Sequence, residues 1–408
     1  MSWPIKFSIY GAGDASSSGA FPSLAPALWR QLHQLQQKLT NEKIAGVAQL
    51  DGVSHPTMRW ILDPKRRFKT YTLGETNTGD PRGLVDFCSW SFARCPAELD
   101  VLVLSGHGLA FQDNRTGSYL GRGAVSHMPM FRTNKKLFGN LSAGFSRAVL
   151  VDQDDFVSVP ELKGALGQIA NLRQDSSIGV VVFDACLMSN VELLYEIHEF
   201  ADTAVGSVDE LSGAGLDLSG AATIATNRLR RGEEMDSEKM AAAFSDSFSP
   251  AWTTDSCVAV SLDTKQQQSL LVAFQKFVIA LSALDLAERQ TNSKIRIALS
   301  DGSRRLSRYQ SKSLSDIAAF CSAFMSEDFP KKVRNAAKRF LSASESIVLN
   351  AKLGSDYERA LGISIFSPSS FAEFRKDRLD YSGLSFAKKT GWLKFLEAVY
   401  ADEIYETV

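Results

Sequence analysis

The chain has 408 residues, 44% of them hydrophobic and 22% charged, and its formal net charge at pH 7 is −1. This length predicts two packed units with a large buried core, and the composition is that of an ordinary globular protein in water. Because the charge is close to zero, nothing in the composition favours nucleic acid or an anionic membrane as a partner, and we expect neither.

The N-terminal sequence, the apolar stretches and the cysteines indicate the cellular compartment of the protein. No apolar stretch reaches the ~20 residues of a membrane span, and the N-terminus, MSWPIKFSIYGAGD, lacks a basic segment followed by a long apolar run. The five cysteines are odd in number, and none has the spacing of a zinc site or a CxxC motif. We therefore predict reduced thiols, no metal and a cytoplasmic location.

Apolar runs alternate with helical patterns over the first two thirds of the chain. Continuous Val/Ile/Leu strands separated by helices are typical of a parallel sheet covered on both faces. The predicted elements, in chain order, are a strand at 5–10, a loop at 11–20, a helix at 24–39, a strand at 44–50, a helix at 82–94, a strand at 100–108, a helix at 160–172, a strand at 178–186 followed directly by a helix, and a strand at 201–209. We predict an α/β domain over residues 1–264 and a mainly helical C-terminal unit over residues 265–408, interrupted at 361–368.

The segment between residues 114 and 151 differs from the rest of the chain in charge. It contains no acidic residue, it is rich in glycine and serine, and its periodicity is weak. Its basic residues are Arg115, Arg122, Arg132, Lys135, Lys136 and Arg147. A long irregular segment in a compact domain is usually functional or disordered, and composition alone favours a solvated surface loop.

Two of the predicted buried strands end in residues that can do chemistry. One ends in SGHG, with His107, and the other in DAC, with Cys186. Reactive groups collect at the carboxyl ends of parallel strands, so we predict Cys186 as a nucleophile and His107 as its base. A helix beginning at Cys186 would lower the pKa of the thiol, and the N–H groups of Gly108 and Cys186 would receive an oxyanion.

Each of these residues also has a structural interpretation. A buried cysteine at a strand end is usually inert, and a histidine beside glycine is usually part of a polar turn. The placement of both at the ends of two strands favours the catalytic interpretation. The sequence patterns alone leave the pairing open.

Several longer segments resemble the clostripain-like cysteine peptidases, which are relatives of caspases, gingipains and legumains. They are GETNTGDPRGLVDFCSW (74–90), SGHG (105–108), VSVPELKGAL (157–166), DACLMSNVELLYEI (184–197), LGISIFSP (361–368) and YSGLSFAKKTGWLKFLEAVY (381–400). The likeness covers nearly the whole chain, and its most specific part is DAC followed by LMSNVE. It implies a caspase-like α/β fold and a cysteine endopeptidase that works through an acyl-enzyme, with Cys186 as nucleophile and His107 as general base.

The resemblance also implies a specificity pocket. Asp184 would line the pocket for the residue before the cut bond, and a carboxylate there would select arginine or lysine. Asp209 would form a second acidic wall, although the family's Ser-Glu-Glu pattern leaves Glu210 as the alternative. Asp184 as a helix cap beside Cys186 is the competing interpretation.

Processing is a further implication, because family members are commonly precursors cut between the histidine and the cysteine. The segment at 114–151 lies there and offers six basic sites. We therefore predict a zymogen cut in this segment, by itself or by an upstream peptidase, in a bacterial stress, death or defence cascade. The predicted partners are polypeptides with Arg or Lys at the cut site. No cofactor is predicted, because the sequence has no calcium loop although some relatives need calcium. The alternatives are a silent binding scaffold and a transpeptidase with the same acyl-enzyme.

Overall fold

The computed structural model describes residues 2–13, 24–39, 43–52, 55–62, 68–108, 110, 151–152, 155–173, 177–305 and 313–406. All six basic residues of the predicted activation segment lie outside these ranges. Cutting in that segment therefore stays a prediction.

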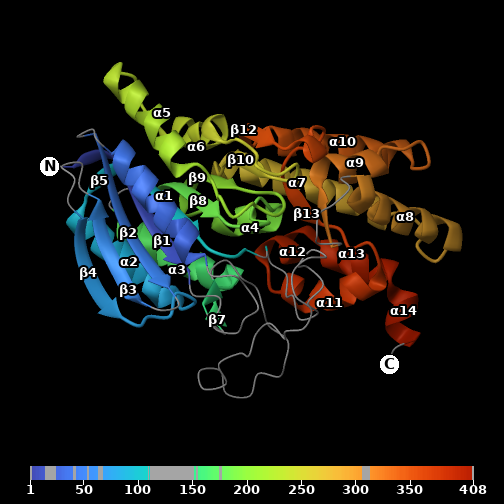
Figure 1. The fold of residues 1–408 in the computed structure, drawn as a ribbon. Coiled ribbons are helices and arrows are strands. Elements are labelled where there is room, and N and C mark those ends of the chain that lie inside the picture. The colour runs from blue at the N-terminus through green and yellow to red at the C-terminus, as the bar shows by residue number, and fades with distance from the viewer. Residues whose placement is uncertain are drawn as a thin grey trace.

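A nine-stranded sheet forms the centre of the molecule (Figure 1). Its order is β12 (Val348–Leu353), β10 (Ser256–Ser261), β9 (Ala201–Gly206), β8 (Ile178–Asp184), β5 (Ala97–Ser105), β1 (Trp3–Ala12), β2 (Ile44–Gly52), β3 (His55–Leu62) and β4 (Phe68–Gly74). The neighbours from β9 to β2 run parallel, whereas β10 and β3 are antiparallel to the strands they flank. The predicted α/β fold with a largely parallel sheet is confirmed.

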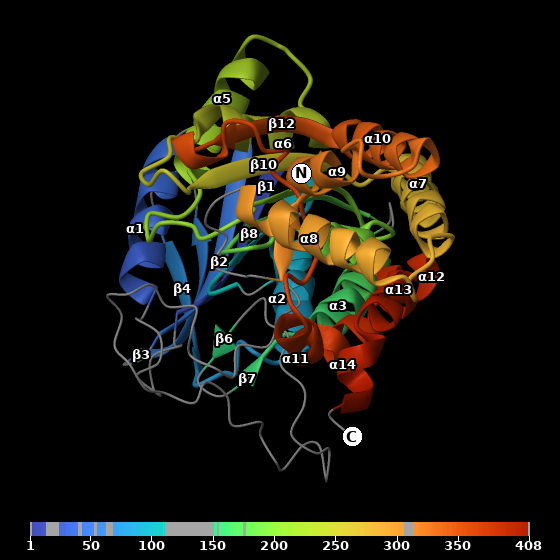
Figure 2. The ribbon, with the colours of Figure 1, turned by 90° about the vertical axis from the view of Figure 1, so that its right-hand side faces the viewer.

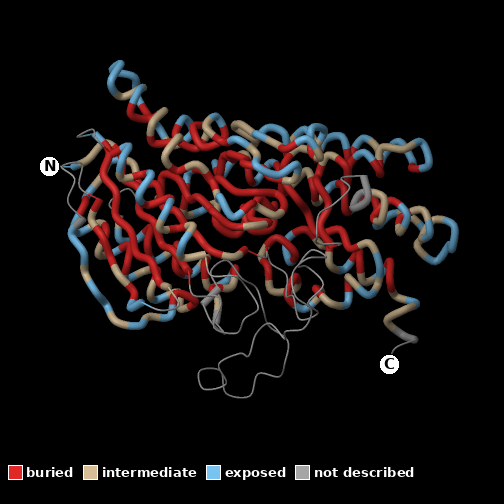
Figure 3. The backbone as a smooth tube through the Cα atoms, viewed as in Figure 1, coloured by how far each residue is buried: buried red, intermediate tan, exposed pale blue. Residues whose placement is uncertain are grey.

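Helices cover both faces of this sheet, and each face has its own apolar cluster. Along β8, Val180 and Val182 belong to one cluster, while Val181 and Phe183 belong to the other. The first face is covered by α1 (Ala25–Lys38), α5 (Leu218–Arg230) and α6 (Ser237–Ser247), and the second by α2 (Pro81–Arg94), α3 (Val159–Asn171) and α4 (Val191–Ile197). Buried residues accordingly follow the strands, and exposed ones follow the outer helices (Figure 3). Burial on both faces is why these parallel strands are mainly apolar.

The helix starts follow local sequence rules. Ser158 and Glu161 form a capping box at the start of α3. Asp80 accepts a hydrogen bond from the N–H of Arg82, and Pro81 is the first residue of α2. The glycine–aspartate–proline turn within the family-like segment at 74–90 is thus an ordinary helix start.

The C-terminal part is mainly helical, and Figure 2 views the molecule from the side that these helices cover. Its elements are α7 (Thr264–Ser282), α8 (Arg289–Arg305), α9 (Ile317–Phe324), α10 (Lys331–Glu345), α11 (Phe371–Ser382), α12 (Ser385–Thr390), α13 (Trp392–Val399), α14 (Ala401–Glu406), and the strands β11 (Leu314–Asp316) and β13 (Ser364–Phe366), which pair with each other. Strand β12 nevertheless joins the central sheet through β10, and one apolar cluster runs from β8 into these helices. The boundary at residue 264 stays a prediction, and residues on both sides of it share a sheet and a core.

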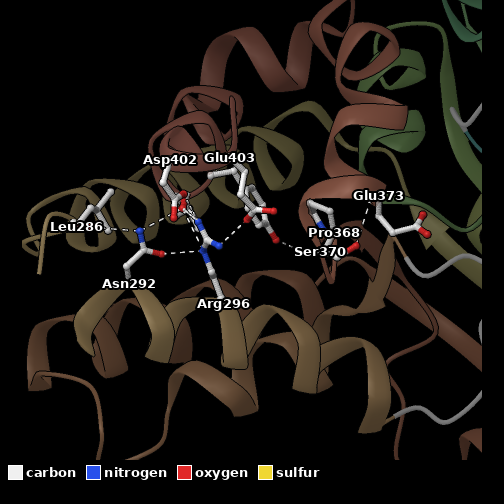
Figure 4. Close-up of polar contacts among 10 residues, drawn as sticks. Leu286, Asn292, Arg296, Pro368, Ser370, Glu373, Asp402 and Glu403 are labelled. Atoms are coloured by element: carbon white, nitrogen blue, oxygen red, sulfur yellow. Dashed lines mark hydrogen bonds and ion pairs between the residues drawn. The ribbon is translucent and has the colours of Figure 1, made fainter. Parts of the chain in front are cut away.

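An ionic cluster fastens the last helices (Figure 4). The guanidinium of Arg296 in α8 contacts the carboxylates of Asp402 and Glu403 and donates to the carbonyl oxygen of Val399. The Tyr400 ring lies 5.0 Å from the same guanidinium. These contacts tie α14 to α8 at the molecular surface.

Candidate active site

The turns after β5 and β8 lie side by side. Ser105, the last residue of β5, is in register with Asp184, the last residue of β8. The N–H of Gly106 donates to the carbonyl oxygen of Asp184 over 3.3 Å, which extends the pairing beyond both strands. Residues 106–108 therefore run alongside residues 184–186 at the carboxyl edge of the sheet.

Gly108 touches the backbone of Cys186. A Cβ atom on Gly108 would lie 2.3 Å from the Cys186 carbonyl oxygen and 3.0 Å from the Cys186 nitrogen. Only glycine permits this approach. The contact brings His107, which is half-buried, to the turn that carries the thiol.

The thiol of Cys186 is held by a loop from the other side. The N–H of Leu211 donates to Sγ over 3.3 Å, and Sγ lies 3.9 Å from the carbonyl oxygen of Leu211. Burial is the largest cause that raises the pKa of Cys186 to about 12; the charges of the neighbouring carboxylates add to the rise, and the hydrogen bond from Leu211 opposes it. In this conformation the thiol is protonated at neutral pH.

The prediction that a helix begins at Cys186 and lowers its pKa is wrong. Helix α4 begins at Val191, and the side chain of Asn190 caps it. Between the strand and the helix lies a turn in which Leu187 adopts a positive φ of 62°. Because the helix starts five residues beyond the thiol, Cys186 does not belong to its first turn, and burial dominates the pKa of the thiol.

Two backbone N–H groups, those of Gly108 and Cys186, lie on the adjoining turns. Among the hydrogen bonds of the described residues, none comes from the N–H of Gly108 or of Cys186. Their close approach to each other is set by the Gly108 contact. Two neighbouring N–H groups that have no acceptor among the described residues are chemically suited to a developing oxyanion.

Asp184 is a buried carboxylate beneath the thiol turn, with 6% of its surface exposed. It accepts hydrogen bonds from the hydroxyl of Ser105 at 2.9 Å and the N–H of Leu216 at 2.7 Å. Burial raises its pKa, and these hydrogen bonds, with one from Gln31, oppose the rise. The interpretation as a helix cap is wrong, because Asn190 caps α4.

Asp209 and Glu210 have different surroundings. Asp209 is buried, and its carboxylate accepts a hydrogen bond from the hydroxyl of Tyr357. Glu210 is half-buried, and burial, followed by the charge of Asp209, raises its pKa to about 7. The structure therefore brings both carboxyl groups to the thiol region and leaves Glu210 the more accessible.

Sequence reasoning missed several residues around the thiol. Leu211, Leu216, Gln31 and Tyr357 all contact Cys186, Asp184 or Asp209. They come from segments far apart in the chain, and two of them act through the backbone. A residue pattern carries no signal for such contacts.

Two absences concern the described residues alone. No group of three or more His, Cys, Asp or Glu side chains comes together there to hold a metal ion. None of the helices in that part of the chain combines the length and the hydropathy of a membrane span.

A cysteine and a histidine on adjoining turns, with backbone donors beside them, form an arrangement suited to a cysteine peptidase. The sequence profile of the clostripain family matches residues 146–398, and the chain belongs to this family of cysteine peptidases. No curated protein matches the chain significantly.

Solved structures of C11 proteases have the same fold. An inactive zymogen C11 protease from Parabacteroides distasonis is 17% identical, with a TM-score of 0.62 over 96% of this chain and 99% of that one. A secreted C11 cysteine protease from Bacteroides thetaiotaomicron, bound to an irreversible peptide inhibitor, is 14% identical, with a TM-score of 0.63 over 95% and 99%. Another structure of a secreted C11 protease of that species is 12% identical, with a TM-score of 0.65 over 96% and 100%.

Proposed function

We propose that this cysteine peptidase is an endopeptidase that cuts after Arg or Lys through a Cys186–His107 dyad. The observation that carries the proposal is the contact between Gly108 and the backbone of Cys186. It supports a histidine and a thiol on touching turns, which is the minimum for nucleophilic acyl transfer.

In the proposed reaction His107 takes the thiol proton, and Sγ of Cys186 attacks the carbonyl carbon of the substrate. The oxyanion lies against the N–H groups of Gly108 and Cys186, a contribution of roughly 3 kcal/mol for one such donor. The imidazolium then donates its proton to the leaving amine, which departs and leaves a thioester. Water, activated by the neutral imidazole, hydrolyses the thioester and restores the thiol.

The buried Asp184 carboxylate supports the preference for a basic side chain. An incoming guanidinium would pair with it, whereas an acidic side chain would be repelled. Glu210 adds a second carboxyl group near the thiol. In our proposal these two groups, with Asp209 behind them, make up the acidic wall.

We further propose that the chain is a zymogen activated by cutting between residues 114 and 151. The protonated, loop-bound thiol supports this, because it is a poor nucleophile in the described conformation. Replacing all six basic residues of the segment by glutamine should leave an uncut chain with low activity, measured by intact mass and peptidase assay. Full activity of that uncut chain would contradict the zymogen proposal.

Fluorogenic peptides with Arg, Lys, Asp or Ala before the reporter test the dyad. The processed enzyme should cut after Arg and Lys, and Cys186→Ala and His107→Ala should each lose at least ~1000-fold in kcat. His198→Ala and Cys321→Ala are matched controls, since neither residue lies at the carboxyl edge of β5 or β8. If the processed enzyme turned over none of the peptides, the scaffold alternative would replace this proposal.

The sequence also predicts a location, a biological role and the absence of a cofactor. A cytoplasmic location and a role in bacterial defence stay predictions, and the similar proteases of Bacteroides thetaiotaomicron are described as secreted. The absence of a cofactor also stays a prediction. Activity in excess chelator, compared with activity in added calcium, tests it.

A further inference from the structure

An exposed tryptophan lies on the same edge of the sheet as the thiol. The loop 248–255 leads into β10, and Val258 of β10 is paired with Gly206 at the end of antiparallel β9. The start of β10 therefore lies beside the end of β9, at the carboxyl edge of the parallel strands. Trp252 in this loop is 52% exposed.

One buried carboxylate connects Trp252 to the loop that holds the thiol. Asp255 accepts hydrogen bonds from the N–H of Trp252 at 2.9 Å and from the N–H of Ser212 at 2.8 Å. The residue before Ser212 is Leu211, whose N–H donates to Sγ of Cys186. The Asp255 carboxylate thus links the backbone of Trp252 to that of Ser212, and Ser212 is bonded directly to Leu211, the hydrogen-bond donor to the nucleophile.

The tryptophan loop is also held from its far side. The N–H of Gly354 donates to the carbonyl oxygen of Asp255 over 2.8 Å, and the N–H of Asp356 donates to that of Thr253 over 3.0 Å. A Cβ atom on Gly354 would lie 2.3 Å from the Thr253 oxygen, so the two segments are in direct contact. A loop clamped on both sides presents its indole with little loss of conformational entropy on binding.

The indole of Trp252 is exposed and is not a member of the apolar core. Trp252 belongs to neither core cluster of the described residues. The other large apolar side chains that are exposed in this part of the chain lie on helices, at a helix end or on the outer strand β4. Rigid exposed aromatic side chains are enriched where proteins bind peptides.

The position of the general acid relative to the nucleophile determines which part of a substrate would contact the indole. The general acid that protonates the leaving amine lies on the leaving-group side of the nucleophile. His107 follows β5, whereas the tryptophan loop precedes β10, and β8 with Cys186 lies between them in the sheet. Trp252 therefore lies on the acyl side.

We infer that Trp252 forms an apolar subsite for a substrate side chain N-terminal to the basic residue that precedes the cut bond. This inference rests on the proposed function. The expected occupant is a bulky apolar or aromatic side chain, which would stack on the indole while the substrate backbone passes the Leu211–Ser212 segment.

The test compares kcat/KM for acetyl-tripeptide reporters with Arg before the reporter and either Phe or Gly at each of the two upstream positions. The processed wild-type enzyme should prefer Phe over Gly at one position by about tenfold. Trp252→Ala should bring that ratio close to one, and Trp252→Phe should retain most of it. Leu379→Ala, which removes a 60% exposed side chain from α11, should leave the ratio unchanged.

Two results would overturn the inference. One is a wild-type preference that persists in Trp252→Ala, and the other is an equal loss on both peptides, which indicates a structural role. If the enzyme cut Ala or Asp reporters and not Arg reporters, the proposed specificity would fail first and the inference with it. The two failures are distinguishable, because the reporters that differ in the residue before the cut bond are assayed first. The tripeptides that differ at the two upstream positions are assayed afterwards.

Discussion

The backbone N–H of Leu211 donates a hydrogen bond to Sγ of Cys186 over 3.3 Å. The loop that supplies this donor also donates from Leu216 to Asp184, and it is anchored to Asp255 through Ser212. One loop thus covers the nucleophile and the carboxylate of the proposed specificity pocket. Access to both groups depends on where this loop lies.

Alkylation of Cys186 in the uncut chain should be slow at neutral pH. With the pKa raised to about 12, about one thiol in ten thousand is ionised at pH 8. The rate with iodoacetamide, followed by peptide mapping, should rise about tenfold per pH unit from pH 7 to 10. The other four cysteines are buried and serve as internal controls. A rate that is flat above pH 7 would show an ionised thiol in the uncut chain and contradict the expectation.

Asp184→Asn should cost activity on basic substrates selectively. Loss of a charged partner weakens transition-state binding by roughly 2–4 kcal/mol, or about 30- to 1000-fold in kcat/KM for Arg reporters. Ser105→Ala is the matched control, because it removes one hydrogen bond to the same carboxylate and keeps its charge. Equal losses on Arg and Ala reporters would indicate a structural role for Asp184.

The same carboxylate predicts a pH dependence. Burial raises the pKa of Asp184, so the group gains a proton as the pH falls through this raised value. The kcat/KM for Arg reporters relative to Ala reporters should therefore decline on the acid side, and Asp184→Asn should abolish that decline. Measuring the ratio between pH 4 and pH 8 checks this.

Glu210 should influence the thiol through its charge. Its pKa is raised to about 7, so its carboxyl group ionises as the pH rises through neutrality and then disfavours the thiolate of Cys186. Glu210→Gln should shift the alkylation profile of Cys186 to lower pH. Glu98→Gln is the control, because Glu98 lies at the start of β5, on the opposite edge of the sheet. An unshifted profile in Glu210→Gln would remove the electrostatic link.

Strands are easiest to predict from the sequence where their side chains are buried on both faces of the sheet. The parallel strands β1, β2, β5, β8 and β9 are largely buried on both faces and mainly apolar, so their runs are visible in the sequence. The antiparallel strand β3 and the outer strand β4 were not predicted. Their side chains alternate between buried and exposed, as in HPTMRWIL of β3, and tertiary pairing decides their structure.

For the site, strand ends could be predicted and loop contacts could not. His107 and Cys186 follow apolar runs that end in glycine or at a turn, and parallel strands bring such ends together. The state of the thiol depends on Leu211, which is 25 residues farther along the chain and acts through its backbone. The hydrogen bond from Leu211 lowers the pKa of the thiol, as a helix N-terminus would, but burial outweighs it and raises the pKa.

A buried ionic cluster lies at the amino edge of the sheet, away from the thiol. A substitution there should therefore change the stability of the protein without changing its activity. Lys6 of β1 lies 2.8 Å from a carboxylate oxygen of Asp100 in β5, and Arg173, beyond α3, contacts the other oxygen. Lys6 and Asp100 are nearly inaccessible to water. Both lie in the amino half of their strands, away from the thiol.

Asp100→Asn should lower the free energy of unfolding by roughly 3–5 kcal/mol at pH 6, because the Arg173 guanidinium and the Lys6 ammonium, whose pKa burial lowers to about 7, lose their counter-charge. The measurement is the denaturant midpoint of the uncut chain, with kcat of the processed enzyme at 20 °C as the companion. We expect a lower midpoint and a kcat close to that of the wild type. Glu233→Gln, which breaks the exposed pair with Arg231, should leave the midpoint unchanged. An unchanged midpoint in Asp100→Asn would mean that Lys6 is neutral in the folded protein and that the pair contributes little.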